Sequence, residues 1–175
     1  MESTFPDGRL TAFGNQLIDV HLWLRQELAR LRTDFGSFVD GGERLRTLQA
    51  HCLTFCSAVA RHHTGEDEGA FPALAEAFPE LRPLLEELRK DHRVVAETMA
   101  RLEELVGGLG PDTDSGRARD VRGELDGLAA VLESHFVYEE RRIVSALNAL
   151  SVPAWQGTRP GFLLTGSEGT TATET

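Results

Sequence analysis

Four histidines could be gathered in one place, because each falls on the apolar stripe of a different predicted helix. They are His21, His62, His92 and His135. Two of them are followed four residues later by a glutamate, so Glu66 and Glu139 lie one helical turn further along the same inward face. Burying unpaired charges costs several kcal/mol or more, and a bound metal pair removes that cost. The spacing therefore predicts a metal site inside a helical core.

The types of side chain in this set restrict the metal and its chemistry. Four neutral imidazoles and two carboxylates suit iron, manganese or zinc, and they do not suit a thiolate cluster. Two carboxylates on opposite helices can each bridge two ions while two histidines cap each ion. Positions then remain for solvent, dioxygen or species derived from it. A ferritin-type site requires Glu-x-x-His pairs, and none of the residues three before the six histidines is a glutamate.

Helical angle separates the members of two doublets. Adjacent helix residues differ by about 100°, so His63 next to His62, and Glu140 next to Glu139, are expected to point away from the core. Replacing His63 or Glu140 with alanine is accordingly expected to be mild, apart from an effect of about 10-fold if either orients a ligand. His51 also lies off the inward stripe and is expected to be an ordinary surface residue.

Two other pairs of possible ligands are given no role. Asp67 and Glu68 are expected in a solvated turn before Phe71-Pro72. The two cysteines stand four residues apart on one predicted helix, which is neither a disulfide framework nor a thiolate metal site. Cys52 falls on the inward stripe as a small core residue, and Cys56 lies off that stripe.

Steps of three and four residues between apolar positions predict the helices that carry these side chains. The inward positions run from Leu17 to Leu31, Leu45 to Glu66, Leu81 to Val106 and Val121 to Glu139. Glycines and prolines separate these stretches, and the run from Asp112 to Ser115 can cap the fourth. Helices of about 20 residues joined by short to moderate loops favour an all-α, up-down-up-down antiparallel four-helix bundle.

The helical pattern ends near Pro153, which divides the chain into two parts. The bundle is expected over residues 1–152 and a C-terminal extension over residues 153–175. Within the extension, Trp155, Phe162, Leu163 and Leu164 could fold back over the bundle end. Residues 166–175 are expected to be a disordered tail.

Composition and charge narrow the kinds of partner. The chain has 175 residues, is 41% hydrophobic and carries a net charge of −10 spread along the helices, which suits one globular domain. An acidic surface argues against nucleic acid and against an anionic membrane. No apolar run approaches the roughly 20 residues that span a bilayer, and the N-terminus lacks the features of a signal peptide. We therefore expect a soluble cytoplasmic protein, and a protein partner is left open.

The ligand motifs, taken together, resemble those of the haemerythrin-like (HHE cation-binding) family, particularly its bacterial members. The segments that carry the resemblance are His21-Leu22-Trp23-Leu24-Arg25, His62-His63-Thr64-Gly65-Glu66 with Phe71-Pro72 following, Asp91-His92, and His135 with Glu139-Glu140. They cover roughly residues 15 to 147 and are specific in their combined order and spacing. The resemblance implies two iron ions, bridged by an oxo or hydroxo group, inside a four-helix bundle.

The resemblance also implies a role for each candidate ligand. His21 and His62 would serve one iron, His92 and His135 the other, and Glu66 and Glu139 would bridge them. Oxygen-carrying haemerythrins have a further histidine on the third helix where this chain has Leu88, and a last carboxylate where it has Glu140. A symmetric site with two histidines on each ion argues against simple reversible oxygen carriage. Whether His63, Tyr138 or Glu140 adds a ligand is left open.

Function is expected to follow from open positions beside two redox-active ions. The first hypothesis is a di-iron protein that binds or reacts with dioxygen, peroxide or nitric oxide, in oxidative-stress handling with catalase-like turnover. The alternative is a module that senses iron or oxygen, or stores iron, without turnover. A di-iron oxygenase acting on an organic substrate would need an apolar cavity beside the metals. The sequence identifies no catalytic residue and leaves enzymatic turnover open.

Overall fold

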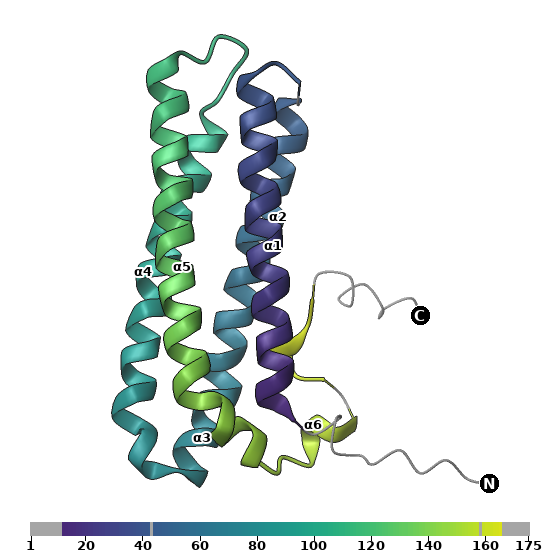
Figure 1. Cartoon of the computed structure of the whole chain (residues 1–175), viewed down its shortest axis with the longest axis vertical. Helices are drawn as coiled ribbons and strands as arrows, with labels where there is room; N and C mark the ends of the chain where they lie inside the picture. The colour runs from purple at the N-terminus through teal and green to yellow at the C-terminus, as the bar shows by residue number, and fades with distance from the viewer. Residues whose placement is uncertain (1–11, 43, 158, 166–175) are drawn as a thin grey trace, which may run out of the picture.

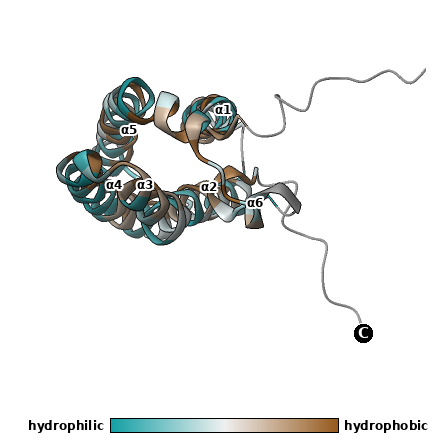
Figure 2. Cartoon of the chain, turned by 90° about the horizontal axis from the view of Figure 1, so that it is seen from below, coloured by the Kyte–Doolittle hydropathy of each residue, from teal (hydrophilic) through white to brown (hydrophobic). Residues whose placement is uncertain are grey.

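Four long helices make up most of the computed structural model, which describes residues 12–42, 44–157 and 159–165. They are α1 (Phe13–Val39), α2 (Leu45–Gly65), α4 (Arg82–Gly107) and α5 (Ser115–Ala149), and they lie side by side (Figure 1). Helix α1 contacts α2 and α5, and α4 contacts the same two helices, so the four enclose a common interior (Figure 2). The described residues contain no strand, and the all-helical prediction is confirmed.

Apolar stripes line this interior above and below a polar centre. On α5 the buried positions Leu125, Leu128 and Leu132 lead to His135 and Glu139, and apolar burial resumes at Ile143. Arg142 stands one residue off this stripe and places its guanidinium over the ring of Tyr138. The stripe therefore continues past the polar residues, as helical period requires. Asp114, within the predicted capping run, accepts a hydrogen bond from the backbone N–H of Arg117 and begins α5.

The connection from α2 to α4 is helical for most of its length. Helix α2 passes into the π-helical turn η2 (Glu66–Ala70), which leads into α3 (Phe71–Ala77) and then the 3₁₀ turn η3 (Pro79–Leu81). Pro72 and Pro83 occupy first-turn positions of α3 and α4, where a missing N–H has no cost. Because α2 continues through η2, Asp67, which was expected in a solvated turn, lies beside α4 and contacts Arg89 and His92.

The C-terminal extension folds back on the bundle. Helix α6 (Ala154–Gly157) is followed by the 3₁₀ turn η4 (Gly161–Leu163), which contacts α1 and α2 (Figure 1). Phe162 and Leu163 are buried, and the ring of Trp155 meets those of Phe13 and Phe162 edge-on. The tail predicted over residues 166–175 lies outside the described residues. Within the described residues, no helix combines the length and apolar character required to span a membrane.

Candidate metal centre

A cluster of buried histidines and glutamates occupies the interior of the helical core. Its members, referred to below as the His–Glu cluster, are His21, His62, His63, Glu66, His92, His135 and Glu139. Their potential ligand atoms form two groups: His21, His62, Glu66 and Glu139 in the first, and His63, Glu66, His92 and His135 in the second. Within each group the atoms lie within 4.8 Å of one another. All six predicted residues are therefore brought together, with His63 added.

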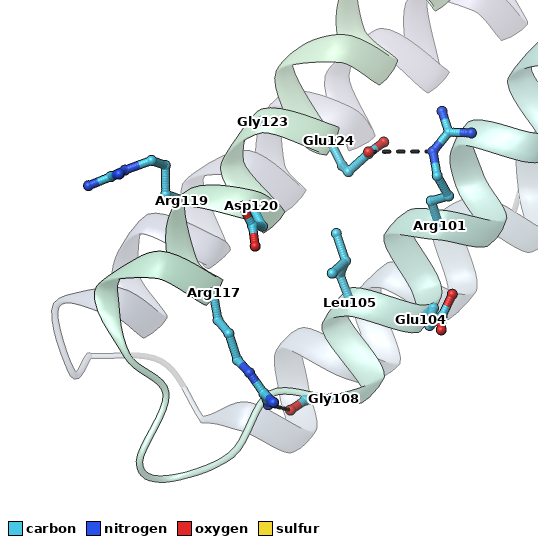
Figure 3. A pocket seen from close by; sticks show the side chains of 9 residues that line it. All are labelled: Arg101, Glu104, Leu105, Gly108, Arg117, Arg119, Asp120, Gly123 and Glu124. Atoms are coloured by element: carbon cyan, nitrogen blue, oxygen red, sulfur yellow. Dashed lines mark hydrogen bonds and ion pairs between the residues drawn. The ribbon is translucent and has the colours of Figure 1, made fainter.

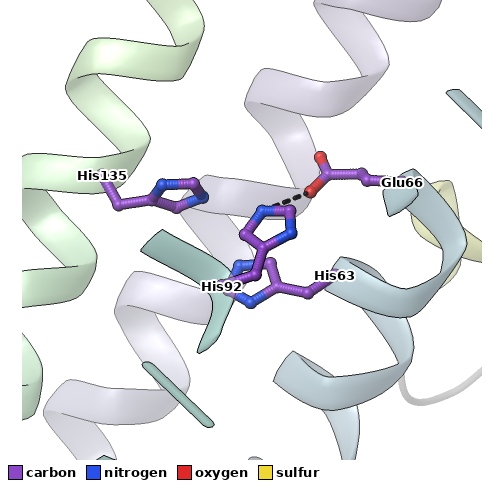
Figure 4. Close-up of side chains that lie close together, drawn as sticks. All are labelled: His63, Glu66, His92 and His135. Carbon is purple, nitrogen blue, oxygen red and sulfur yellow. Dashed lines mark ion pairs between the residues drawn. The ribbon is translucent and has the colours of Figure 1, made fainter. Parts of the chain in front are cut away.

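Distances between these atoms suit ligands that share an ion. In the first group, His21 Nε2 lies 3.1 Å from His62 Nε2, which is 3.3 Å from a Glu66 oxygen. Two ligand atoms about 2.1 Å from one ion, at a right angle, would be about 3.0 Å apart. The second group has the same spacing, with His92 Nε2 3.3 Å from the other Glu66 oxygen (Figure 4).

Both carboxylates face histidines of both groups. The two Glu66 oxygens point separately to His62 and His92, while one Glu139 oxygen lies 3.4 Å from the Nε2 atoms of both His21 and His135. Glu66 and Glu139 are fully buried. This arrangement allows each carboxylate to bridge two ions.

The expectation that His63 points away from the core is wrong. Its side chain is 5% exposed and its ring stacks on that of His92, with centroids 3.9 Å apart and planes at 9°. The buried face of α2 is wider than one stripe, because Cys56, seven residues earlier and also expected off the stripe, is buried too. Cys56, an apolar residue on the same helical face as His63, was the signal in the sequence that His63 would be buried. The 100° between neighbours directs His62 toward His21 and His63 toward His92.

His63 also changes the histidine count on which the expected symmetry depended. The third-helix position without a histidine is filled by Leu88, which is buried. His63 contributes an imidazole from α2 instead, so the second group has three histidines and the first has two. The two groups therefore hold unequal numbers of histidines, and the assignment of two histidines to each ion stays a prediction.

Four of the five cluster histidines have an acceptor at their outward-facing nitrogen. Three Nδ1 atoms contact carboxylates: His21 with Glu140 at 2.9 Å, His92 with Asp67 at 2.8 Å and His135 with Asp91 at 3.4 Å. Metal-bound histidines nearly always donate their second N–H to such a group, which fixes the ring. The expectation that Glu140 points away from the core is therefore wrong. The expectation that Asp67 lies in a solvated turn without a role is wrong as well. The Tyr138 hydroxyl donates a hydrogen bond to Glu87 at 3.3 Å.

The tautomers of His21 and His62 leave two lone pairs facing each other. Burial lowers the pKa of both imidazoles well below the usual value, so each is neutral and carries one N–H. His21 Nδ1 faces the Glu140 carboxylate, and His62 Nδ1 faces the main-chain carbonyl of Phe162 at 2.6 Å. Both partners only accept, so both protons lie on Nδ1. The two Nε2 atoms, 3.1 Å apart, then cannot hydrogen-bond, and a cation between them would satisfy both.

Unpartnered polar atoms provide an independent test of the fit to a metal. Among the described residues, every buried side-chain nitrogen or oxygen without a hydrogen-bond partner belongs to the His–Glu cluster. They are the Nε2 atoms of His63, His92 and His135 and the carboxylate oxygens of Glu66 and Glu139. Leaving each such atom unpaired costs about 1–3 kcal/mol. Burial also raises the pKa of Glu66 and Glu139 well above the usual value. The donor set fits a pair of metal ions.

The cluster is closed by aromatic packing and does not open into the larger surface hollows. Phe136 stacks on His21 with ring centroids 4.0 Å apart, and Phe71 stacks on His92 at 5.5 Å. A hollow of about 690 Å³ lies between the end of α4 and the start of α5, where Arg101 pairs with Glu124 (Figure 3). None of its lining residues belongs to the cluster.

Comparison with known proteins agrees with this geometry. The chain matches the model of the Hemerythrin HHE cation binding domain over residues 14–147, and it belongs to that family. Searches of curated proteins and of solved structures found no significant match. The matched range contains the whole His–Glu cluster and ends before η4. Family and donor set together support metal binding, with iron as the typical metal.

Proposed function

We propose that the four long helices form an up-down-up-down antiparallel bundle whose interior holds a di-iron centre, and that this centre binds or reacts with dioxygen, peroxide or nitric oxide. The observation that carries the proposal is the convergence of bare imidazole nitrogens on two buried carboxylates. Neutral imidazoles and carboxylates form a donor set that suits iron. Membership of the haemerythrin HHE family supports the same metal.

Ligand assignment follows the two groups. His21 and His62 hold one ion, and His63, His92 and His135 hold the other. Glu66 and Glu139 each bridge both ions, since each faces histidines of both groups. The first ion then has four protein ligands and the second has five, so both remain below six. Two iron ions with open positions supply redox chemistry and a binding position for a small ligand.

The surrounding side chains restrict what can approach. Phe136 and Phe71 cover ligand imidazoles and keep water from them. Arg25 holds the Glu140 carboxylate that orients His21, and its guanidinium also lies over the Phe136 ring at 5.2 Å. A groove of about 270 Å³ between α1 and α5 is lined in part by Arg25 and Phe136, and the Phe136 ring separates it from His21 by stacking on that imidazole. Such a close-packed approach favours a diatomic ligand or peroxide over a bulky organic substrate.

Iron analysis and optical spectra of protein purified from iron-rich medium test this proposal. About two irons per chain are expected, with an absorption band that changes when azide or nitric oxide is added. Well under one iron per chain, with no such band, would refute a di-iron centre. Peroxide decay, measured against His62→Ala, then decides whether the protein turns peroxide over.

A sensing module without turnover is the second candidate, and one contact favours it. The carbonyl of Phe162 in the C-terminal extension accepts a hydrogen bond from the ligand His62, so a change at the first ion can reach a segment at the protein surface. A sensor binds iron normally yet shows peroxide decay equal to that of His62→Ala. Cytoplasmic localisation stays a prediction.

A further inference from the structure

The extension beyond the family match contributes a direct contact to the His–Glu cluster. Three of the histidines have carboxylate partners from α5, η2 and α4, but the Nδ1 of His62 donates to the main-chain oxygen of Phe162, one hundred residues later in the chain. The distance is 2.6 Å and the contact is buried. The matched family segment ends at residue 147 and lacks this acceptor.

A glycine on α2 makes the close approach of the two backbones possible. A Cβ added at Gly65 would lie 2.7 Å from the backbone nitrogen of Phe162 and 3.0 Å from its Cα. Contacts under 3.0 Å to backbone atoms force a displacement, so any larger residue at position 65 would push η4 away from α2. Gly69, four residues further on, has nothing within 4 Å of the same added atom.

Apolar anchors hold the Phe162 carbonyl in place. The side chains of Phe162 and Leu163 are each 1% exposed. The Phe162 ring meets Trp155 at a centroid distance of 5.5 Å, and Trp155 meets Phe13 of α1 at 5.0 Å. The segment is thus fixed to both helices that supply the two histidines of the first group, and its carbonyl is presented to His62 rigidly.

We propose that η4 (Gly161–Leu163), seated on Gly65, is a positioning element of the metal centre. The Phe162 carbonyl keeps the proton of His62 on Nδ1, so that Nε2 stays deprotonated and directed at the ion shared with His21. This inference rests on the proposed di-iron site for its effect on iron, but its effect on the His62 tautomer is independent of iron. Phe162 is a positioning residue and does not bind the metal.

Gly65→Ala in the full-length protein tests the proposal, with Gly69→Ala as the matched control. In iron-free protein, ¹⁵N NMR of labelled histidines is expected to report His62 with its proton on Nδ1, and Gly65→Ala should convert it to a mixture of tautomers. His92, held by Asp67, should be unchanged. In iron-loaded protein, release of iron to a chelator should be about 10-fold faster in Gly65→Ala. Gly69→Ala should match the wild type in both measurements.

The two measurements separate the possible failures. A folded Gly65→Ala with wild-type His62 signals and wild-type iron release overturns the proposal. A change in the NMR signals of His63 and His92 as large as that of His62 also overturns it, because it would report a general shift of α2. If Gly65→Ala does not fold, Phe162→Ala removes the anchor instead and must produce the same change at His62. If the wild type binds no iron, the di-iron proposal fails while the NMR result still decides the role of η4.

Discussion

Replacing His63 with alanine is the most direct test of the site geometry, because helical angle alone predicts a mild effect and the structure predicts a large one. The His63 ring is buried against His92, and its Nε2 lacks a hydrogen-bond partner. If His63 is the third histidine of the second group, the variant loses one of the five protein ligands proposed for that ion. The first group keeps all its ligands, so we expect about one iron per chain where the wild type holds about two.

The energetic consequence differs between the metal-free and metal-loaded states. In the metal-free protein two effects of deletion oppose each other: the cavity costs about 2–5 kcal/mol, and loss of the unpaired Nε2 recovers about 1–3 kcal/mol. In the loaded protein the loss of affinity adds to this. A loss of about 100-fold, the upper end of what is typical for residues that only orient a ligand, removes about 2.7 kcal/mol of metal-linked stability. The difference between the stability losses of His63→Ala in the metal-loaded and metal-free states therefore isolates the contribution of metal binding.

Chemical denaturation with and without iron, together with iron counts, measures both quantities. His51→Ala on the same helix is the matched control, since His51 is a partly exposed residue that pairs with Asp34 at 2.6 Å. It should lose about 1 kcal/mol or less, equally in both states, and keep its iron. Two irons per chain in His63→Ala, with the same stability loss in both states, would refute the assignment of His63 as a ligand.

Three further predictions concern the remaining members of the site. Glu140→Gln removes the anionic partner of His21 Nδ1 and should weaken iron binding about 10-fold in a chelator competition, with helix content unchanged by circular dichroism. Glu66→Gln should leave less than one iron per chain, because Glu66 belongs to both groups; an intact pair of irons would contradict a bridging role. Burial lowers the pKa of four cluster histidines below 6.5, that of His135 to about 4, and raises the pKa of Glu66 and Glu139 above 4.5. Below pH 6.5 the unfolded chain binds protons that the folded histidines do not, so their contribution to stability is lost as pH falls. The glutamates act oppositely, since they are protonated in the folded state over a range where the unfolded chain is ionised. The effect of the four histidines outweighs that of the two glutamates, so the free energy of unfolding of the metal-free protein, measured by urea titration, should decrease from about pH 7 to about pH 5. A free energy of unfolding that does not change over this range would contradict these pKa shifts.

Most of the His–Glu cluster could be predicted from helical period. His21, His92 and His135 each extend a run of apolar residues spaced three and four apart, and the structure buries all three in one cluster. Glu66 and Glu139 follow from the same spacing, since a residue four positions on stays on the same face. Helical period was sufficient to predict the burial of these residues because they occupy the centre of each buried stripe. Small errors in helical angle do not change which way a side chain points there.

The edges of the stripes and the contacts between distant segments were decided by tertiary structure. His63 is buried because the interior beside α2 is wider than a single stripe, and that width depends on how α2 packs against its neighbours. Asp67 reaches His92 because α2 continues through a π-helical turn, which the sequence presents only as a polar run.

Helical period thus determined an all-helical core with imidazoles and carboxylates at its centre, because period depends on residues close together in the chain. The partner of His62 depends on residues far apart. Every residue carries a carbonyl, so nothing in the identity of Phe162 marks its oxygen as an acceptor. Only the folded chain, with η4 seated on Gly65 and anchored by Phe162 and Trp155, brings that oxygen to His62.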